Sequence, residues 1–265
     1  MNWKFIWRGA GLALTAIGLG LVGFYLLLPS LFPAVPSGPI PPPPTIGSAA
    51  GPQPEHWPGL EAVAHYANEP PALAGSAFVL DLGNAMRVAA TAAHNFNLAG
   101  GLEAIQLRPP GGSIPILELD TLHGTPGRPR LFGIKLTGDY LLLQIESGMR
   151  PQAVLMPDGR GGPLPGERVV LYAGVGEAAM KQMPLFGTIF RADRAGAWAA
   201  MDATFEPGLM SGSPILSLYT GRVVGMAVAA GQADGHTIIG MHPIGSLVEK
   251  ALEAREFPAL QELAR

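Results

Sequence analysis

Three residues have the side chains that nucleophilic catalysis by a serine uses: His94, Asp139 and Ser211. A serine hydroxyl is a weak nucleophile until a neighbouring base accepts its proton, and a histidine that titrates near neutral pH can accept it. A carboxylate beside the histidine fixes the tautomer of the ring and stabilises the imidazolium that forms in the transition state. The chemistry open to such a set is acyl transfer.

Each of the three residues lies at the end of a short apolar run. His94 follows the run 89–93, Asp139 precedes the run 140–143, and Ser211 lies in a loop just before the run 215–218. Runs of this length, bounded by turn residues, are typical of β-strands. Residues far apart in sequence can meet where strand ends converge on one cleft.

Five segments, in this order along the chain, resemble motifs of the trypsin-like (chymotrypsin-fold) serine peptidases, especially the bacterial members. T-A-A-H ending at His94 looks like the histidine motif, D-Y-L-L-L from Asp139 is similar to D-[IL]-A-L-L, and S-G-S-P from Ser211 resembles G-x-S-G-[GS]-P. G-S-A-F from Gly75 and V-V-G-M from Val223 resemble the G-[ST]-G-F and V-V-G-I strands. The resemblance covers about residues 75–256.

The resemblance implies a mainly β, two-β-barrel chymotrypsin/trypsin-like fold and a serine endopeptidase. It assigns Ser211 as the nucleophile, His94 as the general base and then acid, and Asp139 as the orienting carboxylate. The competing acids are Asp120 and Asp202. The first lies only 26 residues after His94, and the second lies where the resemblance places the wall of the substrate pocket. Ser213, the competing nucleophile, stands two positions late in the motif.

The sequence departs from the family pattern two residues before the nucleophile. The family usually has a glycine there, and its N–H forms half of the oxyanion hole, whereas this chain has Leu209, with Gly208 one position earlier. Either the loop carries an extra residue, or Leu209 supplies the N–H group from an unusual conformation. The expected donors are the N–H groups of Leu209 and Ser211.

The resemblance also places a substrate pocket, whose residues are mostly small or apolar and favour an uncharged substrate side chain. Its expected lining residues are Phe205, Glu206, Val228, Ala229 and Ala230, with the strand around Met241. His242 either adds a polar group to this pocket or, as we expect, faces solvent at a strand end.

The rest of the chain after residue 59 reads as short strands separated by turn residues, as in all-β barrels and sandwiches. A helix is expected over 60–68, and a capping box of Ser246 and Glu249 predicts a C-terminal helix over 247–256. The expected strands are 77–82, 86–90, 104–107, 114–119, 140–145, 153–156, 169–172, 185–190, 215–218, 223–229 and 237–241.

The N-terminus predicts a membrane anchor. Residues 9–28 are uncharged and, as a helix, would span the ~30 Å hydrocarbon core of a bilayer. Lys4 and Arg8 precede this stretch and the next cation is Arg87, which places the N-terminus in the cytoplasm. A cleaved signal peptide is the alternative, but its apolar region would be shorter and followed by a small-residue cleavage site.

We therefore expect a cytoplasmic segment at 1–8, a transmembrane signal anchor at 9–28, a proline-rich spacer at 29–58 and a protease domain at 59–265. The anchor implies a single-pass protein of the inner (cytoplasmic) membrane, with the protease domain in the periplasm or outside the cell. The expected partner is a protein or peptide substrate.

Composition excludes several other classes of function. The chain has no cysteine, so it can form neither a disulfide nor a thiolate site. A net charge of −3 without a basic cluster gives no basis for nucleic-acid binding. No metal or other cofactor is expected, because the remaining histidines lack the spacing of metal ligands: His56, His65, His123 and His236.

Two other functions compete with that of a serine peptidase. An esterase of another fold would show G-x-S-x-G and the order Ser, Asp, His, which are absent. The remaining alternative is a degenerate protease fold that binds peptides or a partner.

Overall fold

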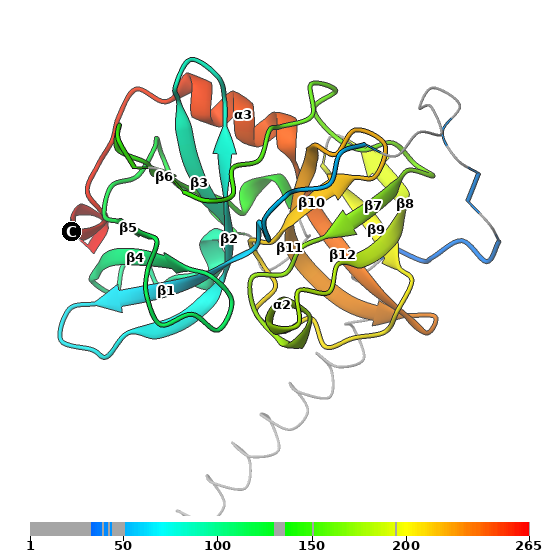
Figure 1. Ribbon diagram of the computed structural model, residues 1–265, viewed down its shortest axis with the longest axis horizontal. Coiled ribbons are helices and arrows are strands. Elements are labelled where there is room, and N and C mark those ends of the chain that lie inside the picture. Colours follow the sequence, from blue (N-terminus) through cyan, green and yellow to red (C-terminus); the bar gives the residue numbers. More distant parts are fainter. Residues whose placement is uncertain are drawn as a thin grey trace, which may run out of the picture.

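Two antiparallel β-barrels of six strands each lie side by side, and the helices of the described residues are few and short (Figure 1). This computed structural model describes residues 33–38, 40–41, 43, 51–129, 136–149, 151–193 and 195–264. Within these ranges no helix has both the length and the apolar character needed to cross a membrane. The predicted anchor, residues 9–28, lies outside the described residues.

The first barrel contains six strands in the order β5-β4-β1-β2-β3-β6. The segment after β5 closes it by pairing with β6: the backbone N–H of Gln144 donates to Thr121 O (3.0 Å), and that of His123 donates to Leu142 O (2.8 Å). The strands are β1 (Leu60–Tyr66), β2 (Ala72–Asp81), β3 (Arg87–Thr91), β4 (Leu102–Arg108), β5 (Leu117–Leu119) and β6 (Leu141–Gln144).

The second barrel is closed by the pairing of β7 with β10, so all of its strands have two neighbours. Its order is β10-β11-β12-β9-β8-β7. The strands are β7 (Arg168–Leu171), β8 (Leu185–Asp193), β9 (Gly196–Met201), β10 (Pro214–Ser217), β11 (Val223–Ala233) and β12 (His236–Pro243).

Strand β2 shows why the two barrels form one body. Successive side chains of a strand point to opposite faces. Ala77 and Val79 therefore pack in the core of the first barrel, while Phe78 and Leu80 pack in a second cluster that contains residues of both barrels. A strand buried on both faces reads as a continuous apolar run, which is why the segment has no polar alternation.

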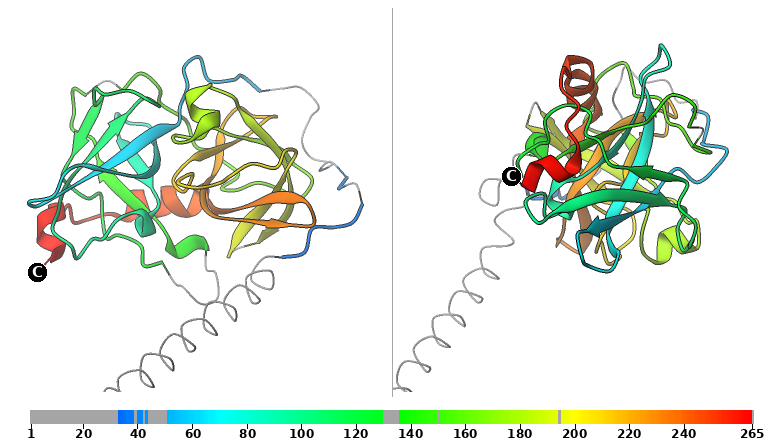
Figure 2. Two further views of the ribbon diagram at one scale, coloured as in Figure 1. Left: turned by 90° about the horizontal axis from the view of Figure 1, so that it is seen from below. Right: turned by 90° about the vertical axis from the view of Figure 1, so that its left-hand side faces the viewer.

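The C-terminal part of the chain joins the barrels a second time. Helix α3 (Ile244–Glu253) follows β12, and the ring of His123 in the first barrel lies with its Nε2 2.9 Å from the Ala251 carbonyl oxygen of α3. The chain then returns to the first barrel, where Leu260 is fully buried and the C-terminus lies (Figure 2). The other helical turns that the structure describes are α2 (Glu177–Met180), η1 (Ala93–Asn95), η2 (Leu136–Gly138) and η3 (Leu260–Ala264).

Residues 51–58 lie on the second barrel before the chain enters the first. The indole N–H of Trp57 donates to Ala173 O (2.9 Å), and the ring stacks edge-on against Tyr172 at 5.1 Å. Gly51 N–H donates to Leu218 O (2.7 Å). The described end of the predicted spacer is therefore packed against the barrel; its division from the protease domain stays a prediction.

Most of the expected strands are present, and the mainly β fold with a C-terminal helix is confirmed. The helix expected over 60–68 is wrong, because that segment is β1 and pairs with β2 and β4. The expected strand at 153–156 is wrong too, since it makes only one isolated bridge, from Leu155 to Leu80. Helix α3 begins at Ile244 with Pro243 as its N-cap residue, so Ser246 lies inside the helix and caps nothing.

Candidate active site

His94 and Asp139, two of the predicted catalytic residues, are in contact. His94 lies in η1 just after β3, and Asp139 lies just before β6; the pairing of β3 with β6 brings these ends together. One oxygen of the Asp139 carboxylate contacts His94 Nδ1, and the other accepts the backbone N–H of His94 at 3.0 Å. With Nδ1 used in this way, Nε2 is the ring nitrogen left for another partner.

The loop that carries Ser211 is held against the His94 segment by its backbone. The carbonyl oxygen of Ser211 accepts the backbone N–H of Ser76 (3.0 Å) and the side-chain amide of Asn95 (2.9 Å). Asn95 is the residue after His94. Both contacts cross from the first barrel to the second. Among the described residues no hydrogen bond joins Ser211 Oγ directly to His94.

Two successive tight turns shape this loop. Met210 N–H donates to Pro207 O (3.2 Å), and Ser213 N–H donates to Met210 O (3.0 Å). The third residue of each turn has a positive φ: Leu209 at 61° and Gly212 at 96°. The left-handed conformation costs a residue with a Cβ about 1–2 kcal/mol. Of the two alternatives for Leu209, the structure therefore supports the unusual conformation.

The N–H groups of Leu209 and Ser211 are both unpaired. Neither donates a hydrogen bond to any residue that the structure describes. The carbonyl of Met210 points to Ser213 N–H, and a trans peptide directs its N–H the opposite way, so the Ser211 N–H faces away from the turn. An oxyanion hole is built from N–H groups that are free in this way.

The residues expected to line the substrate pocket divide into two groups. Phe205 is half-buried and packs on the core cluster that contains Ala227 and Met241, as does Ala230. Val228 and Ala229 pack instead against the cluster shared by the two barrels.

Thr237, fully buried on β12, fixes the backbone of Phe205. The Thr237 hydroxyl accepts Phe205 N–H (3.0 Å) and donates to Phe205 O (3.3 Å). The side chain of Glu206 is exposed.

The competing residues lie elsewhere or are enclosed. Asp120 accepts the hydroxyl of its neighbour Thr121 at 2.7 Å. Asp202 forms a two-pronged ion pair with Arg168, with N–O distances of 2.7 and 2.5 Å. Ser213 is fully buried. None of them contacts His94 among the described residues.

His242 does not face solvent, so the expectation of an exposed histidine at a strand end is wrong. It is fully buried, because β12 lies between two strands in the barrel and beneath the first barrel. Its ring stacks edge-on against Tyr140, the residue after Asp139, at 5.5 Å. Among the described residues neither ring nitrogen makes a hydrogen bond of good geometry, and its polar neighbour is the backbone of Asp139. Burial lowers the pKa of His242 to about 4, an effect that nearby Asp139 offsets only in part.

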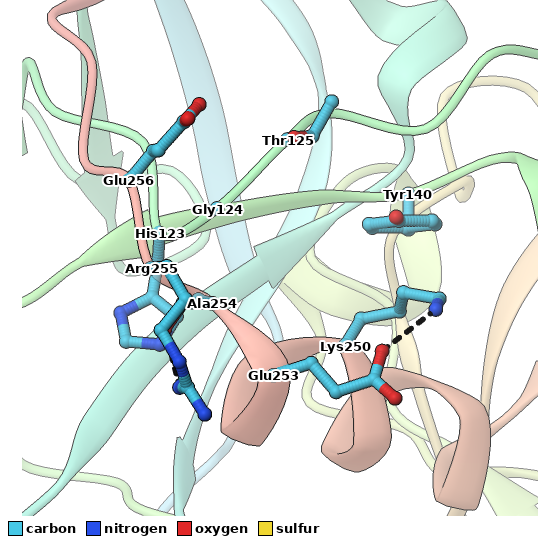
Figure 3. A pocket seen from close by; sticks show the side chains of 9 residues that line it. All are labelled: His123, Gly124, Thr125, Tyr140, Lys250, Glu253, Ala254, Arg255 and Glu256. Atoms are coloured by element: carbon cyan, nitrogen blue, oxygen red, sulfur yellow. Dashed lines mark hydrogen bonds and ion pairs between the residues drawn. The ribbon is translucent and has the colours of Figure 1, made fainter.

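A polar cavity of about 400 Å³ has Tyr140 in its wall (Figure 3). One wall carries the ion pair of Lys250 with Glu253 (3.0 Å). Neither His94 nor Ser211 lines the cavity, so it is distinct from the candidate active site. The lining residues are His123, Gly124, Thr125, Tyr140, Lys250, Glu253, Ala254, Arg255 and Glu256.

For two residues of the site, no sequence pattern indicates a role. Ser76 was part of the G-S-A-F motif, which gave its strand but no role for its side chain. Asn95 carried no signal beyond its position after His94. Both act through the Ser211 loop, from which they are more than 110 positions distant in sequence.

The fold is that of the chymotrypsin-type serine proteases, with the candidate site at the junction of the barrels. No protein-family model matches the chain, and no curated protein matches its sequence. Among solved structures, a thermostable serine protease from an extremophilic microorganism matches with a TM-score of 0.51 and 14% identity, over 75% of this chain and 97% of that one.

Two further matches have lower TM-scores. Tobacco etch virus protease complexed with product gives 0.48 at 13% identity, over 77% of this chain and 81% of that one. Kallikrein-related peptidase 10 gives 0.46 at 16% identity, over 73% and 92%. At such low identity the likeness concerns the fold alone.

Proposed function

We propose that the chain is a serine endopeptidase that hydrolyses peptide bonds through an acyl-enzyme. Ser211 Oγ attacks the substrate carbonyl carbon while His94 Nε2 takes the hydroxyl proton, and the carbonyl oxygen becomes an oxyanion. The N–H groups of Leu209 and Ser211 stabilise that oxyanion. The C–N bond then breaks as His94 gives its proton to the leaving amine. Water, activated by His94, hydrolyses the ester and frees Ser211.

The observation that carries this proposal is the double use of one short segment of the first barrel. His94 binds the Asp139 carboxylate, while the next residue, Asn95, binds the carbonyl of Ser211. The base and the nucleophile loop are therefore fixed to the same turn of backbone. Such pre-positioning lowers the entropic cost of bringing reacting groups together.

The surroundings of the pocket support an uncharged substrate side chain. Phe205 and Met241 belong to an apolar cluster, and the exposed Glu206 carboxylate lies outside it. Burying a charged side chain against such a surface without a partner is unfavourable. Peptide libraries that vary the residue before the cleaved bond test this preference; it is wrong if lysine, arginine, aspartate or glutamate is preferred there.

For the whole chain we propose single-pass anchoring in the inner (cytoplasmic) membrane through 9–28, with the protease domain in the periplasm or outside the cell. The uncharged stretch and the cations before it support this arrangement. The test is extraction of membranes with alkaline carbonate, combined with protease access in intact and permeabilised cells. Recovery in the soluble fraction would contradict it.

A fluorophosphonate probe, which reacts with an activated serine, tests the enzyme. We expect the purified chain to label, and the Ser211→Ala and His94→Ala variants not to label. Ser147→Ala, outside the site, is the matched control and should label like the natural chain. Absence of label on the natural chain would contradict the proposal.

A second function is favoured by one observation, the exposed leucine in the left-handed conformation beside the nucleophile. If that loop does not support turnover, the same cleft would act as a peptide- or partner-binding module. Peptide binding that survives Ser211→Ala, together with no fluorophosphonate label, distinguishes this function from the first.

A further inference from the structure

We propose that Ser76 is a positioning residue that holds Leu209 in the conformation needed for the oxyanion hole. The inference rests on the proposed function, because an oxyanion hole has meaning only in an enzyme. It goes beyond it by assigning a role to a side chain in the other barrel. The role depends on a leucine, and not a glycine, standing two residues before Ser211.

Ser76 is a fixed point in the structure. It is fully buried on β2, and its carbonyl oxygen accepts the hydroxyl of Thr91 on β3 at 2.7 Å. Its backbone N–H donates to the carbonyl of Ser211 at 3.0 Å. The nucleophile loop is thus already tied to Ser76 through the backbone, which brings the Ser76 side chain close to Leu209.

The hydroxyl of Ser76 accepts one hydrogen bond and donates one. Its oxygen accepts Gly174 N–H at 3.1 Å and lies 3.1 Å from the carbonyl oxygen of Leu209, to which it donates. The Gly174 backbone packs closely against Leu60, because a Cβ at residue 174 would lie 2.0 Å from the carbonyl oxygen of Leu60. With its oxygen accepting Gly174 N–H, the Ser76 hydroxyl directs its own proton toward Leu209.

Leu209 needs such a restraint. Its φ of 61° is unfavourable for a leucine, and the residue is 47% exposed, so packing holds it only weakly. A strained backbone persists only where its surroundings over-determine it. The Leu209 N–H, one of the two proposed oxyanion donors, belongs to the Gly208–Leu209 peptide. Rotation of φ to a negative value would turn this peptide relative to the Leu209 carbonyl, which Ser76 holds.

The test is a double-mutant cycle of Ser76→Ala with Leu209→Gly. Because glycine adopts a positive φ freely, the serine should matter only while residue 209 is a leucine. We expect Ser76→Ala alone to lower kcat about 100-fold, as loss of an oxyanion donor does, with little change in KM. In the Leu209→Gly protein the same substitution should lower kcat by less than about fivefold, the size of an ordinary lost hydrogen bond.

Ser217→Ala is the matched control, because Ser217 is also a fully buried serine, with its hydroxyl on Glu167. It should affect stability and leave kcat unchanged. A Ser76→Ala variant with natural kcat, or one impaired equally in both backgrounds, overturns the proposal, since the serine would then act only through the fold or through Ser211.

A crystal structure of Ser76→Ala gives a readout that does not depend on turnover. A negative φ at Leu209 supports the proposal, and a φ that stays near 61° overturns it. This measurement separates the two failures: a chain that lacks the fluorophosphonate label contradicts the enzyme, while the backbone of Leu209 still decides the role of Ser76.

Discussion

The side-chain amide of Asn95 lies 2.9 Å from the carbonyl oxygen of Ser211, and the two residues belong to different barrels. The same amide is 3.4 Å from the hydroxyl of Thr91. Space around Asn95 is tight, because a Cβ at Gly75 would lie 2.3 Å from its nitrogen. Asn95 therefore has little freedom, and it couples the turn that carries His94 to the loop that carries the proposed nucleophile.

Asn95→Ala should lower kcat by about fivefold, the effect of one lost hydrogen bond of ordinary strength. Ser211 keeps its bond to Ser76 N–H, so the loop should loosen without unfolding. Steady-state kinetics with a peptide substrate measure this effect. Asn97→Ala, two residues further along, is the control and should leave kcat unchanged. Equal kcat for Asn95→Ala and the natural chain would show that the contact does not position the nucleophile.

Asp139→Asn should reduce kcat by a factor on the order of 10⁴, as expected when the orienting carboxylate of a triad becomes an amide. Asparagine has the same shape, but its amide nitrogen cannot accept a hydrogen bond from His94 Nδ1–H. The imidazole then carries its proton on the wrong nitrogen, Nε2. The measurement is kcat at neutral pH together with the melting temperature. A variant that keeps more than a tenth of the natural kcat would contradict the role proposed for Asp139.

Much of the fold could be read from the sequence, because strands with short apolar runs and turn residues between them carry a strong local signal. The errors fall where the local signal conflicts with pairing. Leu60 to Tyr66 contains good helix formers, yet β2 and β4 offer backbone partners on both sides and the segment becomes a strand. Strand β9, Gly196–Met201, is not among the expected strands, because it consists largely of alanine and glycine, which have low strand propensity.

The residue types of the candidate site could also be predicted, but the contacts that hold these residues in place could not. The positive φ of Leu209 follows from turns and from Ser76, which is 133 residues away in sequence. The burial of His242 follows from the way the barrels meet. Contacts of this kind depend on the packing of distant strands, for which one sequence contains no local pattern.

Arg160→Met should destabilise the protein by about 3–5 kcal/mol, the cost of leaving a buried charge without its partner. The guanidinium binds Glu167, which is fully buried, at 2.8 Å and Asp158, which is almost so, at 2.7 Å. These contacts keep the pKa of Asp158 below its ordinary value despite burial. Unfolding in urea measures the change in free energy.

The control is Arg191→Met, because Arg191 pairs with Asp193 at 3.0 Å while both side chains are about half exposed. Removing an exposed pair should change the stability by no more than about 1 kcal/mol. Equal effects of the two substitutions would show that burial does not make the Arg160 cluster important.

His242→Phe should remove part of the dependence of stability on pH between about 4 and 6.5. The folded protein holds His242 neutral down to a pKa of about 4, while the unfolded chain protonates it near 6.5. Between these values the unfolded state binds more protons, so the free energy of unfolding falls as the pH falls. Across the window His242 should account for a loss of about 3 kcal/mol.

Phenylalanine has a similar shape and keeps an aromatic ring against Tyr140. Urea unfolding of both proteins at pH 7, 6, 5 and 4 isolates the histidine, because the other titrating groups contribute equally and cancel in the difference. The difference curve should therefore change in favour of the variant by about 3 kcal/mol from pH 7 to pH 4. Parallel curves would show that His242 is protonated, or hydrated, in the folded protein, and that burial at the barrel junction does not hold it neutral.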